Sequence, residues 1–179
     1  MLDLIIKNGS CYIDKDLKNH DIGIKDGKII EIGKIDNEAK EIFDAKGLIV
    51  LPGCIDTQTH FREPGSTDTE DLNSGSRAAI VGGITAVFEM PNTNPPTSNK
   101  KEFQRKLDLA KNRMYCNYAF YFGATADNAN DLSDLKNLEG CCGIKLFAGS
   151  STGNLLVADE KDIETVFQNS SKVVAVHSE

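Results

Sequence analysis

The 179-residue sequence lacks several features that mark whole classes of proteins. It has no dense run of lysine and arginine, and its net charge of −7 argues against a role on nucleic acid or on a membrane surface. Its longest apolar runs are far too short to cross a bilayer. It contains no internal repeat and no low-complexity linker. Charged residues make up 26% and hydrophobic residues 40%, which is typical of a soluble globular protein.

The cysteines show neither an even count nor CxxC spacing. The five are Cys11, Cys54, Cys116, Cys141 and Cys142. Such a set predicts free thiols in a reducing compartment. The first ten residues, MLDLIIKNGS, have an acid at Asp3 and lack a basic segment followed by a small-residue cleavage site. The sequence therefore predicts a cytoplasmic protein without an export signal.

Residues 1–51 are expected to form a small β module. The pair Asp26-Gly27 stands between two apolar alternations, which is the strongest short-range signal of a β-hairpin. Further turns are predicted at residues 36–37 and 45–47.

From residue 52 onward, strands alternate with helices. Thr67 and Glu70 have the spacing of a capping box, which predicts a helix from there to the glycines at 82–83. Further strands are predicted at 84–90, 116–122, 143–147 and 172–177, and further helices around 103–110, 131–138 and 163–167. Five strands alternating with four helices indicate parallel βα units of a (β/α)₈ barrel. Eight units need roughly 250 residues, so we expect the chain to be a fragment.

A row of polar residues follows the first of these strands, in the segment VLPGCIDTQTHFREPG (50–65). Four of them occupy alternate positions: Asp56, Gln58, His60 and Arg62. Alternate residues of an extended strand point to the same face, so these side chains are expected to lie together. Burying such a row is costly unless the groups pair or bind something. The segment therefore predicts a functional site.

Three later residues also fall at or just after predicted strand ends: Asn92, Lys145 and His177. In a parallel barrel the catalytic groups sit at the carboxyl ends of the strands, so we expect these residues near His60. Two imidazoles and a lysine could bind a divalent metal, since histidine is the commonest zinc ligand. Each residue alone also has an ordinary structural explanation; Lys145, for example, could extend along the surface to solvent.

Taken together, four segments resemble the dihydroorotases of the amidohydrolase superfamily. They are PGCIDTQTHFREPG (52–65), MPNTNPPT (90–97), GIKLFAGSSTGN (143–154) and VHSE (176–179). The REPG and MPNT pair favours dihydroorotase over allantoinases, which read MPLN, and over hydantoinases, which lack REPG. The resemblance covers the whole chain. It implies an α/β fold, the N-terminal half of a metal-dependent hydrolase TIM barrel (residues 52–179), preceded by a module of a composite β-sandwich (residues 1–51).

The resemblance also implies a role for each polar residue. His60, Lys145 and His177 would be metal ligands, with Lys145 carbamylated by CO₂ as a bridge between two metals. Arg62 and Asn92 would bind the substrate carboxylate. Gln58 stands where a metal-binding histidine is expected, and its amide oxygen suits zinc poorly. Three explanations of Gln58 are open. It marks a subclass with a modified site, it marks a non-catalytic homologue with lower metal occupancy, or it is a neutral change. We favour the subclass, because the other site residues are present.

The implied function is dihydroorotase, the reversible hydrolysis of L-dihydroorotate to N-carbamoyl-L-aspartate in pyrimidine biosynthesis, with one or two divalent metal ions, zinc in the first place. One alternative is another cyclic amidohydrolase, such as an allantoinase or a hydantoinase. Another is a non-catalytic dihydroorotase-like subunit that partners aspartate transcarbamoylase. The resemblance further implies a homo-oligomer, and a later histidine and a catalytic acid beyond Glu179. The 179 residues alone are therefore expected to be inactive.

Overall fold

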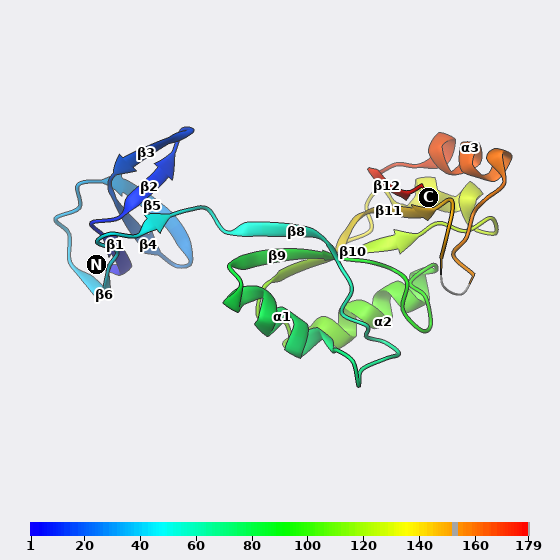
Figure 1. Ribbon diagram of the computed structural model, residues 1–179, viewed down its shortest axis with the longest axis horizontal. Helices are drawn as coiled ribbons and strands as arrows, with labels where there is room; N and C mark the ends of the chain where they lie inside the picture. Colours follow the sequence, from blue (N-terminus) through cyan, green and yellow to red (C-terminus); the bar gives the residue numbers. More distant parts are fainter. Residues whose placement is uncertain (152–153, 179) are drawn as a thin grey trace. The chain divides into compact units, whose positions relative to one another are not determined.

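The structure is a computed structural model that describes residues 1–151 and 154–178. Thr152 and Gly153 of the GIKLFAGSSTGN segment and Glu179 of the VHSE segment lie outside the described residues. The chain divides into two compact units, Met1–Pro52 and Gly53–Glu179 (Figure 1). In the described part of the chain, no helix is both long enough and apolar enough to span a membrane.

The first unit is built from short strands. They are β1 (Leu2–Lys7), β2 (Ser10–Ile13), β3 (Asp16–Asn19), β4 (Asp21–Lys25), β5 (Lys28–Gly33), β6 (Ala39–Asp44) and β7 (Ile49–Val50). They form a four-stranded sheet, β5-β4-β1-β6, and a three-stranded sheet, β3-β2-β7. The predicted hairpin is confirmed: Asp26 and Gly27 join β4 to β5 with φ of 50° and 71°. Positive φ at both central residues is what a tight hairpin turn requires.

The second unit contains a parallel five-stranded sheet in the order β12-β11-β10-β9-β8. Its strands are β8 (Cys54–Thr59), β9 (Ile84–Glu89), β10 (Asn117–Gly123), β11 (Cys141–Phe147) and β12 (Val174–His177). Between them lie α1 (Leu72–Val81), α2 (Lys100–Ala110), the 3₁₀-helix η1 (Ala129–Leu135) and α3 (Glu160–Asn169). The predicted alternation is confirmed, with η1 in place of the third predicted helix. Consecutive strands are neighbours in the sheet, which curls (Figure 1) as part of a barrel does.

The start of α1 differs from the prediction. Its N-cap is Asp71 rather than Thr67, and the capping box consists of Asp71 and Ser74. Asp71 Oδ1 accepts from the Ser74 N–H at 2.6 Å, and Ser74 Oγ accepts from the Asp71 N–H at 3.1 Å. Aspartate caps at least as well as threonine, and the Leu72 N–H is bound at 2.9 Å by the carboxylate of Glu63. A residue outside the helix, nine positions before Leu72, therefore helps to place the first turn.

The core of the second unit holds the strands whose ends carry the site. Phe103 of α2 packs against Phe120 and Phe122 of β10, with ring centroids 6.4 and 6.2 Å apart. Ile144 and Leu146 of β11 are fully buried in the same cluster. Burial of such side chains contributes roughly 1.5–3 kcal/mol each. The ends of β10 and β11 are thus fixed by a packed interior.

Candidate active site

Residues from the ends of four strands meet in one cavity of about 260 Å³, here called the histidine pocket. Its lining includes Gln58, His60, Asn92, Lys145, Phe147 and His177. These residues lie at or just after the carboxyl ends of β8, β9, β11 and β12. The parallel sheet brings these strand ends together, as expected. Residues that the sequence places up to about 120 positions apart therefore share one cavity.

His60 is half-buried directly after β8. Its Nδ1 lies 2.9 Å from Asn92 Oδ1. When Nδ1–H donates to this amide oxygen, Nε2 retains its lone pair, which is the arrangement of a metal-binding imidazole with an outer hydrogen-bond partner. Burial is the main cause that lowers the pKa of His60. The neutral imidazole, the form that binds metal, is thereby favoured.

Lys145 lies on β11 and is only 4% exposed. Its Nζ is 4.9 Å from the centroid of the Phe147 ring, and no carboxylate in residues 1–151 and 154–178 pairs with it. Burial lowers the pKa of Lys145, which favours the neutral amine. Because Lys145 is buried, it does not extend along the surface to solvent. A neutral amine is the form that reacts with CO₂.

His177 ends β12, beside β11. It pairs in register with Phe147, and the two rings are 6.0 Å apart. Gln58, on β8, lines the same cavity, and its backbone N–H donates to Asp56 Oδ1 at 2.9 Å.

Arg62 lies elsewhere than the alternation predicted. The strand ends at Thr59, and Arg62 has a left-handed φ of 57°, so the chain has turned before it. Arg62 lines a neighbouring cavity of about 460 Å³, here called the arginine pocket, which also includes Pro64, Ser66, Asn92, Thr93 and Asn94. The two-residue alternation of side chains holds only within an extended strand and does not continue through such a turn. Only Asn92 among the predicted site residues lines both cavities.

The arginine pocket forms where two loops meet. Asn94 N–H donates to Pro64 O at 2.9 Å, which ties the loop after β9 to the REPG loop, residues 62–65. Gly65 has φ of 125°, and a Cβ there would lie 3.0 Å from the Cβ of Asn94. Glycine is needed both for this conformation and for the close approach.

A zinc site needs three or four strong ligands. Among the described residues, no group of three or more His, Cys, Asp or Glu is arranged to hold a metal ion. The histidine pocket instead offers two imidazoles, the amide oxygen of Gln58 and the buried amine of Lys145. A carbamate on Lys145 would supply an anionic oxygen to complete three strong ligands. With that modification, the residues fit a metal such as zinc.

Sequence reasoning missed several contributors to this region. Ser150 and Ser151 line the histidine pocket, and the available signal was that they follow the strand that carries Lys145. Two ion pairs near the site were also missed, Glu63–Arg113 and Glu89–Lys106. Glu63 stands in the REPG motif, but its partner follows 50 residues later with no motif around it.

Comparison with known proteins supports a hydrolase family. Residues 49–174 match the model of the Amidohydrolase family. An allantoinase from Escherichia coli O1:K1 is 38% identical over 162 residues, which are 90% of this chain and 36% of that protein. An allantoinase from Escherichia coli O139:H28 has the same identity and coverage. The chain thus spans 36% of the length of these curated relatives.

Solved structures agree on the fold. The L-hydantoinase (dihydropyrimidinase) from Arthrobacter aurescens superposes with a TM-score of 0.90 at 29% identity, over 99% of this chain and 41% of that one. The dihydropyrimidinase from Brevibacillus agri gives 0.83 at 26% identity, over 99% and 40%. The curled sheet is therefore that of an amidohydrolase TIM barrel. These names favour the allantoinase and hydantoinase alternative over dihydroorotase. The chain belongs to the amidohydrolase family.

Proposed function

We propose that the complete protein is a metal-dependent cyclic amidohydrolase, which opens a ring by hydrolysis of an amide bond. The histidine pocket carries this proposal, because in a chain from this family it combines His60, His177 and buried Lys145 from the carboxyl ends of three parallel strands. His60, His177 and a carbamylated Lys145 would hold one or two zinc ions, with Gln58 as a weak additional ligand. A bound divalent metal would polarise the ring carbonyl and lower the pKa of a water molecule.

The protein's own groups prepare the site for that chemistry. Asn92 orients His60 through the 2.9 Å contact to Nδ1. Burial keeps both His60 and Lys145 closer to their neutral forms. Neutral forms of both groups are needed, because a protonated imidazole cannot bind metal and a protonated amine cannot take up CO₂.

The names of the relatives favour a ring such as allantoin or a hydantoin as substrate. L-Dihydroorotate is a second candidate, and the arginine pocket supports it. Arg62 and Asn92 line a cavity that adjoins the histidine pocket through Asn92. A guanidinium binds a carboxylate through two parallel hydrogen bonds. Dihydroorotate carries a carboxylate on its ring, whereas allantoin and hydantoin do not.

The test is to express the complete reading frame with zinc and bicarbonate and to assay allantoin, hydantoin and L-dihydroorotate side by side. We expect metal-dependent opening of at least one ring and about two metal ions per chain. A folded, metal-loaded protein that opens none of the rings would contradict the proposal. A protein that retains one metal or none and turns over nothing would instead support the non-catalytic subunit. A cytoplasmic location, a homo-oligomer and an assembly with aspartate transcarbamoylase remain predictions from the sequence.

A further inference from the structure

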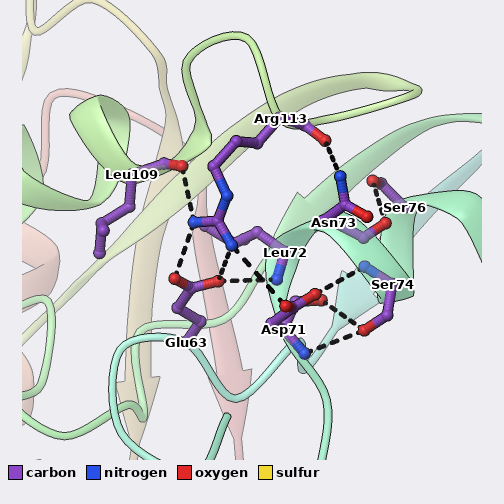
Figure 2. Close-up of polar contacts among 8 residues, drawn as sticks. All are labelled: Glu63, Asp71, Leu72, Asn73, Ser74, Ser76, Leu109 and Arg113. Carbon is purple, nitrogen blue, oxygen red and sulfur yellow. Dashed lines mark hydrogen bonds and ion pairs between the residues drawn. The ribbon is translucent and has the colours of Figure 1, made fainter.

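Glu63, the residue after Arg62, is buried with 7% of its surface exposed. Its carboxylate accepts three hydrogen bonds, drawn in Figure 2. Arg113 Nη1 donates to Oε1 at 2.8 Å, and Arg113 Nη2 donates to Oε2 at 3.0 Å. The Leu72 N–H donates to Oε2 at 2.9 Å. A bidentate pair of this kind fixes the carboxylate in both position and orientation.

These contacts join three segments, of which the one with Arg113 lies 50 residues from Glu63 in the sequence. Glu63 belongs to the REPG loop, Leu72 begins α1, and Arg113 follows α2. Arg113 is itself held, because Nη1 also donates to Leu109 O at 3.0 Å and its own carbonyl accepts from Asn73 Nδ2 at 3.1 Å (Figure 2). These contacts therefore anchor the REPG loop to the start of α1 and to the turn that follows α2.

Two anchors follow Arg62 directly in the chain. The first is the pair of Glu63 with Arg113, and the second is the Pro64 carbonyl, which accepts from Asn94 N–H at 2.9 Å. Arg62 itself has the left-handed φ of 57°, which is unfavourable for a non-glycine residue and persists only where the surroundings impose it. Its side chain is exposed in the arginine pocket, so packing of that side chain does not impose the conformation. The backbone conformation of Arg62 thus depends on its neighbours.

We propose that Glu63 and Arg113 are positioning residues, which hold the REPG loop so that Arg62 stays in the arginine pocket to bind a substrate carboxylate. The inference deepens the proposed function and rests on its second candidate, a ring that carries a carboxylate. Glu63 acts through Arg62 and does not contact the substrate. Its replacement by glutamine places an amide donor against the Arg113 donors and removes the charge that fixes the pair.

The test is a double-mutant cycle in the complete protein, with L-dihydroorotate as the probe and binding measured by calorimetry. Glu63→Gln should weaken binding about tenfold with zinc content unchanged. In an Arg62→Ala background, Glu63→Gln should cause no further weakening, since the residue through which it acts is gone. A merely structural role would weaken binding in both backgrounds. The matched control is Glu102→Gln, which removes the charge of the Glu102–Arg105 pair on α2, where Arg105 is exposed, and should leave binding unchanged.

Arg113→Lys provides a second variant in case Glu63→Gln does not fold, because it retains the charge but loses the two-pronged geometry. It should weaken binding less than Glu63→Gln, and again only when Arg62 is present. Equal losses in the two backgrounds, unchanged binding in both variants, or no dihydroorotate binding by the unsubstituted protein would each overturn the inference. Because the binding measurement does not depend on turnover, the positioning role of Glu63 and Arg113 can be refuted separately from the proposed function. Coupled binding losses in a protein that opens no ring would refute only the proposed function.

Discussion

The buried ion pair between Lys106 of α2 and Glu89 of β9 predicts a large, pH-dependent loss of stability on replacement of Lys106 by methionine. The two side chains are 0% and 1% exposed. Lys106 Nζ also donates to Met90 O at 3.0 Å and lies 5.2 Å from the centroid of the Phe120 ring. Met90 precedes Asn92 by two residues, so the same ammonium holds the backbone that leads into both pockets.

Removing one partner of a buried pair typically costs about 3–5 kcal/mol, because the other charge stays behind uncompensated. Burial raises the pKa of Glu89 from 4.5 to about 7, even with Lys106 beside it. Between these values the folded protein binds more protons than the unfolded chain, so stability is full below pH 4.5 and falls as the pH rises toward 7. The shift corresponds to about 3 kcal/mol. In Lys106→Met the missing cation raises the pKa of Glu89 further, which makes the penalty larger at high pH.

The assay is urea unfolding of the metal-free complete protein at about pH 5 and about pH 8. We expect Lys106→Met to cost roughly 3–5 kcal/mol at the higher pH and clearly less at the lower pH. The double variant Glu89→Leu/Lys106→Met should recover most of the loss, because no buried charge remains. Equal costs at the two pH values, or a double variant as unstable as the sum of the single ones, would refute the reasoning.

Three further predictions concern the site. Lys145→Ala should abolish ring opening, with partial rescue by a small added carboxylic acid. Native mass spectrometry of the unsubstituted protein should show an added CO₂. An active protein with an unmodified Lys145 would contradict this prediction. Arg62→Lys should weaken dihydroorotate binding more than tenfold without loss of zinc, since lysine lacks the two-pronged geometry; lost metal with normal binding would reverse the assigned role. Gly65→Ala should destabilise the protein by about 1–3 kcal/mol, because Gly65 has a φ of 125° and contacts Asn94. The loss should exceed that of Gly47→Ala, where φ is 78° and the space around the glycine is open. Equal effects of the two substitutions would show that the contact to Asn94 is unimportant.

The sequence by itself determined the order of elements and most of the residues that line the histidine pocket. Apolar runs of strand length, bounded by glycine and proline, predicted the parallel strands, and the hairpin at Asp26-Gly27 followed from two residues that tolerate positive φ. His60, Lys145 and His177 were expected together because parallel strands end at one face, and they share the histidine pocket. These features could be predicted because they depend on local residue chemistry and on the rule that parallel strands end at the same edge of a sheet.

Tertiary structure decided what depends on contacts between distant segments. The first turn of α1 starts at Leu72 because Asp71 caps it and the carboxylate of Glu63 binds its N–H, although Thr67 and Glu70 have the right spacing. The separation of Arg62 from His60 follows from one left-handed residue after the strand, which no alternation pattern reveals. Neither the pairing of Glu63 with Arg113 nor that of Glu89 with Lys106 has a sequence signal. Such pairs form only after the chain has folded, because packing brings the groups together and desolvation then sets their energies.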